Sequence, residues 1–189
     1  MLDAATIIFS EQGYDGVSIR DLETAAEVQR GLLAYHFDDK ETLWKAAADR
    51  TFGMLQEEVS SRLEIMQDLP PRERLAALVR FYVRFSARHP EFSRLLTQEA
   101  RQESWRNDYL VDTYIRDMTR GLRGPVSETL GLSDSDFIHW FYMLAGASAT
   151  IFSHAPEGRI LFGVEPLDDS VVERHAELMV KMLLGAFEK

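Results

Sequence analysis

Apolar residues recur along the chain at helical spacing, and polar or proline-containing breaks separate these stretches. Leu2, Ala5 and Phe9 form the first such stripe, and Gly13 should end its helix because glycine tolerates the left-handed backbone that follows a helix. The same spacing predicts two short helices within 18–37, then helices at about 40–66, 71–88, 91–102, 105–130 (kinked near 123), 134–154 and 170–187. No stretch alternates with the period of a strand, so the sequence predicts an all-α protein of about nine helices.

The stretch 18–37 has the pattern of a helix-turn-helix motif. Ser18 is a good N-cap, and Asp21 three residues later makes a variant of the capping box. A tight turn is expected at 26–28, and Leu33 and Phe37 should anchor the second helix. Two short helices joined by such a turn fit the motif. The outward residues of the second helix would be Gln29, Arg30, Leu32, Ala34, Tyr35 and His36.

Charge and composition restrict where the chain could bind DNA and which kinds of site it can form. The 189 residues carry a net charge of -10, and residues 1–50 hold five basic and ten acidic side chains. A DNA-binding domain should present a basic surface, so here that surface can only be local, around Arg30. The chain has no cysteine, which excludes disulfides and thiolate metal sites and suits a reducing cytoplasm. With no signal peptide visible, we expect a cytoplasmic protein.

The segment G-L-L-A-Y-H-F-D-D-K-E-T-L closely resembles the end of the DNA-binding domain in the TetR family of bacterial transcriptional regulators. The family pattern is roughly G-x-L-x-x-H-F-x-x-K-x-x-L, and this chain supplies Gly31, Leu33, His36, Phe37, Lys40 and Leu43. The match covers about the first fifty residues. It implies an N-terminal three-helix DNA-binding domain at 1–47 and a larger helical ligand-binding and dimerisation domain at 48–189.

The resemblance also implies how DNA would be bound. With the second helix in the major groove, Gln29 would pair with adenine and Arg30 with guanine or a phosphate. Tyr35, His36 and Lys40 match family positions that contact phosphates, and Lys40 gains from lying at a helix N-terminus. Together with Leu32, these residues form the predicted DNA-binding surface. Because the chain begins inside the first helix, without the basic arm common in the family, we expect weaker phosphate anchoring.

Four positions depart from the family pattern within this motif. Glu27 stands where a turn glycine is common, and Gln29 where a capping serine is common. Leu32 replaces a frequent Thr or Ser, and Ala34 stands where many members place a phosphate-contacting tyrosine. The operator sequence therefore cannot be transferred from other members.

The last two predicted helices are assigned to a homodimer. The run 137–155 has no charged residue, but its polar residues and the lack of a basic flank favour a buried helix over a membrane span. In the family the last two helices pack against their copies as a four-helix interface. This implies a homodimer through about 134–154 and 170–187.

Aromatic residues crowd the middle of the C-terminal domain, where the family encloses a small-molecule pocket. Aromatic walls with a few polar groups suit an apolar or aromatic ligand. The predicted lining residues are Tyr82, Phe85, Trp105, Tyr109 and Trp140. No cofactor or metal is expected, since Asp136-x-x-His139 is the only metal-like pair and no catalytic motif occurs.

These features predict a ligand-responsive repressor that binds operator DNA as a homodimer, with the helix at 40–66 carrying the signal. Two alternatives stay open. One is a dimeric helical ligand-binding protein with weak or lost DNA recognition. The net negative charge of the N-terminal domain and Ala34 favour this alternative. The other is an enzyme, for which the sequence offers no converging catalytic groups.

Overall fold

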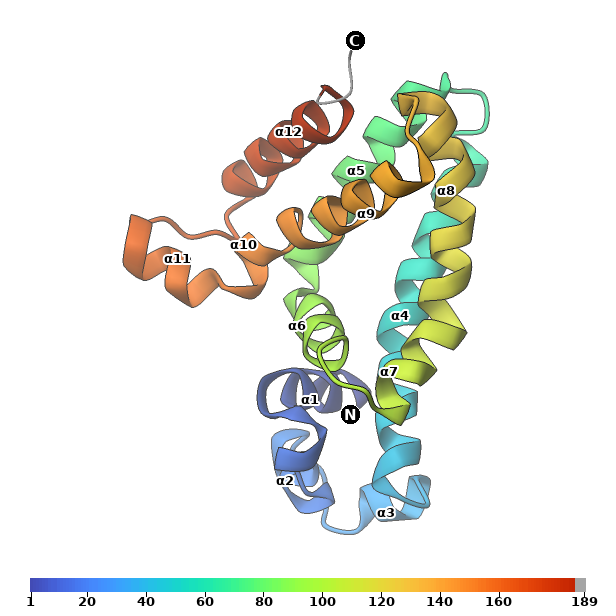
Figure 1. Ribbon diagram of the computed structural model, residues 1–189. Helices are drawn as coiled ribbons and strands as arrows, with labels where there is room; N and C mark the ends of the chain where they lie inside the picture. Colours follow the sequence, from blue (N-terminus) through green and yellow to red (C-terminus); the bar gives the residue numbers. More distant parts are fainter. Residues whose placement is uncertain (186–189) are drawn as a thin grey trace. The chain divides into compact units, whose positions relative to one another are not determined.

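The computed structural model describes residues 1–185, which form helices joined by short connections and contain no strand (Figure 1). This confirms the all-α prediction. The helices are α1 Leu2–Gly16, α2 Ile19–Ala25, α3 Leu32–His36, α4 Lys40–Ile65, α5 Pro71–Arg88, α6 Pro90–Glu99, α7 Trp105–Leu110, the π-helix η1 Val111–Ile115, α8 Arg116–Leu130, α9 Asp134–Ala147, α10 Thr150–Ser153, α11 Ala155–Phe162 and α12 Asp169–Gly185. They divide into unit 1 (Met1–Glu57 with Glu91–Tyr114) and unit 2 (Glu58–Pro90 with the chain from Ile115).

Unit 1 contains the predicted helix-turn-helix and the helices that pack with it. Helix α1 is broken at Gly13, whose φ of 76° is left-handed, as the sequence predicts. A Cβ at that position would lie 2.4 Å from Nε2 of Gln98, so any other residue would displace the end of that side chain and would also be strained by the positive φ. The buried apolar side chains of this unit are Ala5, Phe9, Val17, Leu22, Leu33, Leu43, Trp44, Ala47, Ala48, Phe52, Leu55, Phe92, Leu95 and Leu110.

Helix α4 is the longest of the described helices and begins where the sequence predicts. The backbone N–H of Thr42 donates to Oδ1 of Asp39 at 2.7 Å, so Asp39 is the N-cap. That hydrogen bond, the largest of several effects, lowers the pKa of the Asp39 carboxyl. The helix runs unbroken for 26 residues and belongs to unit 2 from Glu58 onward.

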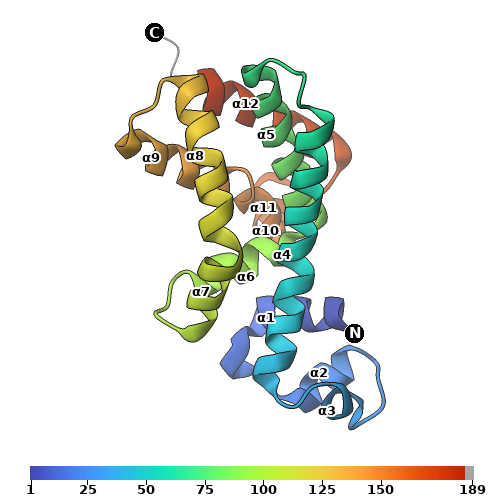
Figure 2. The ribbon, with the colours of Figure 1, turned by 90° about the vertical axis from the view of Figure 1, so that its right-hand side faces the viewer.

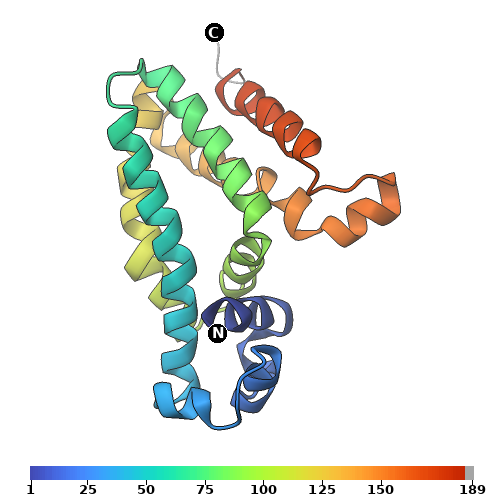
Figure 3. The same ribbon diagram turned by 180° about the vertical axis from the view of Figure 1, so that it is seen from behind.

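Unit 2 is built around α5, which packs along α12 (Figure 3). Trp140 on α9 is fully buried, and its indole N–H donates to the carbonyl oxygen of Leu183 at 3.2 Å. The buried core of this unit consists of Leu75, Val79, Val83, Val126, Leu130, Phe137, Trp140, Phe152, Val172, Ala176, Met179, Leu183 and Leu184.

The predicted helix at 105–130 is interrupted, but not where the sequence indicates. The π-helical turn η1 divides it, while α8 continues through Pro125 as one coil (Figure 2). Pro125 and Gly121 are both exposed, so the carbonyl that loses its helical partner at Gly121 can bind water instead. Val126 and Leu130 are buried next to the proline and hold the helix in place.

The region 134–168 contains more and shorter helices than predicted. Helix α9 ends before Ser148 and Ala149, which are buried, and the one-turn helix α10 follows. The expected loop contains α11, because Pro156 lies in the first turn of that helix, where proline is favourable. Helix α12 ends its described part at Gly185, so the last two residues predicted for it lie outside the described range. Within residues 1–185, no helix combines the length and apolar character of a membrane span.

Candidate nucleic-acid interface and ligand groove

The first helix of the motif begins with the capping box that the sequence predicts. The backbone N–H of Asp21 donates to Oγ of Ser18 at 3.2 Å, and the backbone N–H of Ser18 donates to Oδ2 of Asp21 at 2.9 Å. The hydrogen bonds from Ser18 lower the pKa of the Asp21 carboxyl. Leu22 and Leu33 are buried at 0% and 1% exposure, so α2 and α3 are each anchored by a leucine.

The turn between α2 and α3 is longer than the sequence suggests. Glu27 has a φ of 53°, which is left-handed and is the conformation that the family glycine at this position would adopt without strain. Gly31, with a φ of 87°, is the N-cap of α3. Gln29 and Arg30 therefore lie in the turn ahead of α3 and not on the helix, which corrects the prediction. The left-handed backbone at Gly31 is the reason that the helix does not extend back to them.

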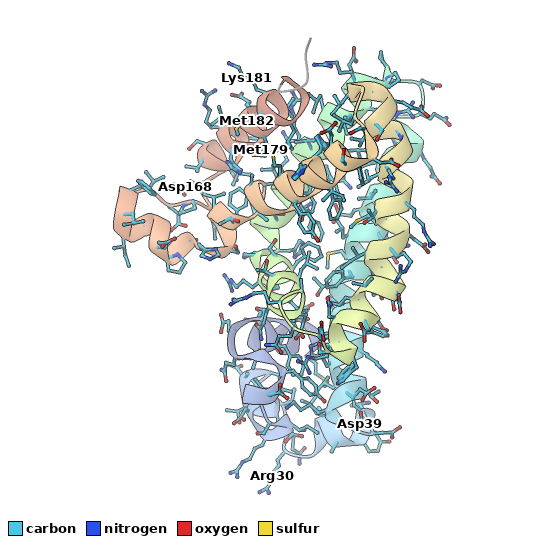
Figure 4. All side chains as sticks on the ribbon, viewed as in Figure 1. Arg30, Asp39, Asp168, Met179, Lys181 and Met182 are labelled. Atoms are coloured by element: carbon cyan, nitrogen blue, oxygen red, sulfur yellow. The ribbon has the colours of Figure 1, made fainter. Side chains whose placement is uncertain are left out.

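Five of the six predicted DNA-contacting residues lie on one short exposed segment. Arg30 extends away from the ribbon into solvent (Figure 4), and Tyr35 on α3 is 83% exposed. Gln29 and His36 are also exposed, and Leu32 is half-buried. We name the stretch from Gln29 to His36 the reading segment.

Lys40, the sixth predicted contact, is held by a neighbouring ring. It is the first residue of α4, and its ammonium lies 4.2 Å from the centre of the Tyr14 ring. This is the geometry of a cation–π interaction. The interaction fixes the side chain while leaving it half-buried at the start of the helix.

Two of the five basic side chains in residues 1–50 are paired with acids. Arg50 binds Asp3, and Lys45 binds Glu41 at 2.7 Å. Arg30, in contrast, makes no ion pair with any residue in the described part of the chain. It is therefore the free positive charge of the reading segment.

Glu23 is a buried acid that sequence reasoning missed. It is 5% exposed, and its Oε1 accepts the backbone N–H of Gly31 at 2.7 Å and that of Leu33 at 3.2 Å. A signal was present in the sequence, since Glu23 lies four residues after Ile19 and three before Ala26, on the same apolar face of α2.

A second missed acid, Asp49 on α4, binds two tyrosines. The hydroxyls of Tyr109 and Tyr114 both donate to its Oδ1 at 2.7 Å. Burial, together with the hydrogen bond to Asp49, raises the pKa of Tyr109 to about 12 and raises that of Tyr114 further. The π-helical turn η1, a feature frequent at functional sites, presents Tyr114 to this acid.

Unit 2 contains a groove of about 460 Å³ between α4 and α5. Its walls combine three arginines with apolar groups: Arg62, Ile65, Met66, Ala77, Phe81, Arg84 and Arg88. The Arg62 guanidinium lies 4.0 Å from the centre of the Phe81 ring. The spacing of Arg84 and Arg88 at i and i+4 was visible in the sequence, but the contribution of α4 was not.

Each arginine of the groove has an acidic partner. Arg84 binds Glu173 through both carboxylate oxygens, at 2.6 and 2.5 Å. Arg62 and Arg88 share Glu58, at 3.0 and 3.3 Å. Three guanidinium groups that line the groove thus share two carboxylate partners, which leaves this set of side chains with a net positive charge.

The residues predicted to line a ligand pocket are divided between the two units. Trp105 and Tyr109 belong to unit 1, where both rings lie edge-on to the buried Trp44. Tyr82, Phe85 and Trp140 belong to unit 2. Phe85 and Trp140 are fully buried, Tyr82 is half-buried, and burial raises the pKa of its hydroxyl to about 12. None of the five lines the groove, and their contact with a ligand stays a prediction.

Comparison with known families identifies the chain. A model described as bacterial regulatory proteins of the tetR family matches residues 1–47. A second model, described as a tetracyclin repressor-like C-terminal domain, matches residues 71–183, which is more than half of the chain. The chain belongs to the TetR family. The resemblance seen in the first fifty residues is thereby confirmed.

Curated relatives of this TetR-family protein match parts of it. The HTH-type transcriptional repressor AcnR of Corynebacterium diphtheriae is 30% identical over 122 residues, covering 58% of this chain and 64% of AcnR. The HTH-type transcriptional repressor DhaR of Mycobacterium sp. (strain GP1) is 36% identical over 75 residues, covering 40% of this chain and 37% of DhaR. The matched segments thus span less than two thirds of these relatives.

Solved structures share the fold over almost the whole chain. A putative fatty acid metabolism regulator of Clostridium perfringens has a TM-score of 0.76 at 17% identity and covers 100% of this chain and 98% of its own. AibR, solved in complex with isovaleryl coenzyme A and operator DNA, has a TM-score of 0.73 at 23% identity and covers 97% and 95%. At these identities the likeness shows that the three chains share a fold.

Proposed function

We propose that this TetR-family protein is a cytoplasmic repressor that binds operator DNA as a homodimer and releases it on binding a small anionic amphipathic ligand. The exposed reading segment, with the unpaired Arg30 next to a capped and anchored helix pair, carries this proposal. The relatives AcnR and DhaR are repressors by name, which supports repression as the sign of regulation.

Dimerisation is part of the proposal because a single N-terminal DNA-binding domain has few basic side chains that could contact DNA. Two recognition helices must lie about one helical turn, ~34 Å, apart to enter successive major grooves. Tyr142 on α9 and Met182 on α12 are 71% and 60% exposed. Met182 lies three residues after the buried Met179 on the same helix, and both are labelled in Figure 4. Large apolar groups in the open are suited to a subunit interface, and α9 and α12 are the helices assigned to it.

The groove in unit 2 is our candidate ligand site. Its volume of about 460 Å³ lies within the usual range for small-molecule sites, roughly 300–1,000 Å³. Arginine binds carboxylate and phosphate through paired hydrogen bonds, while Ile65, Met66 and Phe81 suit an apolar body. An anionic group thus adds to the apolar ligand expected from the sequence.

Two solved structures of the same fold contain ligands of this kind. AibR was solved with isovaleryl coenzyme A, and FadR of Bacillus subtilis with stearoyl-CoA. Both ligands join an acyl chain to phosphate groups. Acyl-CoA thioesters are therefore the first class to test on this protein.

A single helix links the two proposed sites. Helix α4 begins with Lys40 at the DNA-binding end, and its last turns supply Arg62 and Ile65 to the groove, with Met66 directly after the helix. A ligand that favours one position of this helix changes operator affinity by as much as it discriminates between the two states.

The proposal is tested by selecting bound duplexes from a randomised DNA library with the purified full chain. We expect one enriched sequence whose affinity falls as salt rises, and Arg30→Ala should weaken binding by roughly 1–3 kcal/mol if Arg30 contacts a base. Arg120→Ala is the matched control, because Arg120 is exposed in unit 2 and, among residues 1–185, pairs only with Asp117 at 3.2 Å. No enrichment at low salt would favour a ligand-binding protein that has lost DNA recognition.

The response to ligand is measured as release of the selected duplex on addition of each of a series of acyl-CoA thioesters. Release of DNA by one of them, lost in Arg88→Gln while ligand-free operator affinity is unchanged, is the expected result. If every thioester leaves the affinity unchanged, the proposed ligand class is wrong.

A further inference from the structure

Glu23 holds the reading segment through three hydrogen bonds from the backbone. Its side-chain Oε1 accepts the N–H groups of Gly31 at 2.7 Å and Leu33 at 3.2 Å. Its own backbone carbonyl accepts the N–H of Val28 at 3.1 Å. Glu23 on α2 is thus hydrogen-bonded to Val28 in the turn, to Gly31, which is the N-cap of α3, and to Leu33, the second residue of α3.

The environment of this carboxylate is unusual. It is 5% exposed, and no basic side chain in residues 1–185 lies within ion-pair distance of it. Burying an unpaired carboxylate is costly unless hydrogen bonds stabilise the charge. The two N–H groups at the beginning of α3 are therefore the groups that make its burial possible, and charge-assisted bonds of this kind are stronger than neutral ones.

Helix α3 has no other cap. Gly31 has no side chain, and Gln29 stands where a capping serine is common in the family. The first N–H groups of a helix need acceptors, and here a side chain from the preceding helix supplies one for two of them.

We propose that Glu23 is a positioning residue for operator recognition. It caps α3 from within and fixes the turn that displays Gln29 and Arg30, in place of a capping residue in the turn itself. Because its carboxylate occupies this helix N-terminus, a DNA phosphate cannot bind there, and recognition depends on the side chains of the reading segment. The expected effect on operator binding rests on the proposed function, whereas the capping of α3 by Glu23 is tested without DNA.

The first measurement is amide NMR of the full chain labelled with ¹⁵N. In Glu23→Ala the Gly31 and Leu33 amides should move upfield and exchange faster with solvent, because they lose a carboxylate acceptor. Glu23→Gln retains an oxygen acceptor and should leave both amides protected. Unchanged Gly31 and Leu33 signals in Glu23→Ala would overturn the inference, whether or not an operator has been found.

The second measurement is affinity for the duplex selected from the randomised library. Glu23→Ala should weaken binding at least about tenfold, equivalent to ~1.4 kcal/mol, and Glu23→Gln should restore most of it. Glu99→Gln is the control, since Glu99 is another buried acid of unit 1, at 1% exposure, and its carboxylate accepts from Arg106 on α7.

The two readouts separate the possible failures. Equal losses of affinity in Glu23→Ala and Glu99→Gln would show a general effect of destabilisation and overturn the positioning role. If the Gly31 and Leu33 amides respond as expected but no duplex is ever enriched, Glu23 caps α3 but has no role in operator recognition. The proposed function is then wrong as well.

Discussion

The buried ion pair between Arg106 and Glu99 should be a strong determinant of the stability of unit 1. The Arg106 Nε donates to Oε2 of Glu99 at 2.8 Å, and the two side chains are 8% and 2% exposed. The guanidinium also lies 4.8 Å from the centre of the Tyr14 ring. Arg106→Met keeps much of the side-chain volume but leaves Glu99 buried with no basic partner.

The expected cost follows from that burial. Removing one partner of a buried ion pair typically destabilises a protein by ~3–5 kcal/mol, because the other charge stays desolvated. For a chain of this size each kcal/mol lowers the melting temperature by ~2–4 °C, so Arg106→Met should melt ~6–20 °C below the natural chain. In Arg106→Met/Glu99→Leu neither charge remains, and replacing a whole buried pair by apolar groups is often neutral. The double variant should therefore recover most of the loss.

Urea unfolding followed by tryptophan fluorescence measures this cycle. Trp44 and Trp105 lie edge-on in unit 1 with ring centres 5.3 Å apart, so their emission reports on its unfolding. Arg120→Met, which removes an exposed arginine, is the control and should change stability by no more than ~0.5 kcal/mol. A loss below ~1 kcal/mol in Arg106→Met, or a double variant as unstable as the sum of the singles, would refute the reasoning.

Three further changes test other parts of the molecule. Met182→Glu places a charge at a 60% exposed apolar position of α12 and should turn a dimer into a monomer in sedimentation, whereas an unchanged mass would exclude Met182 from the interface. Lys40→Ala should reduce the slope of log operator affinity against log salt concentration by about 1, because one phosphate contact is lost. An unaltered slope would remove Lys40 from the phosphate contacts. The raised pKa values of Tyr109 and Tyr114 mean that the folded chain keeps phenolic protons that the unfolded chain has lost, so stability should fall as pH rises from about 10 toward 12. Tyr114→Phe should reduce that fall, and an equal fall in the variant would contradict the Asp49 contact.

The features that the sequence predicted well are those controlled by neighbouring residues. The capping box of Ser18 and Asp21 involves residues three apart, and the break at Gly13 follows from the backbone freedom of one glycine. The start of α4 at Asp39 follows from a side chain and an N–H three residues on. Local chemistry of this kind is readable from a single chain.

The features that it missed depend on contacts between distant segments. Asp49 lies sixty residues from Tyr109, and no periodicity links an acid on one helix to a hydroxyl on another. The groove pairs Arg62 on α4 with Phe81 on α5, although the arginine spacing on α5 alone was visible. The unbroken passage of α8 through Pro125 was missed for a similar reason, because the buried Val126 and Leu130 outweigh the local effect of proline.

The charge of the chain explains why the position of the reading segment matters so much. A protein with a net charge of -10 gains little from general attraction to DNA, and only Arg30 in this segment is a free cation. With few basic side chains available for phosphates, we expect the affinity of each DNA-binding domain to depend on how well its side chains are held before DNA binds, since ordering them on binding would cost further free energy. A buried acid such as Glu23 adds one more negative charge to an acidic head, yet it holds the backbone of the turn in place. Because the N-terminal domain has so few cations, we expect this fixed geometry to contribute more to recognition than one additional negative charge removes.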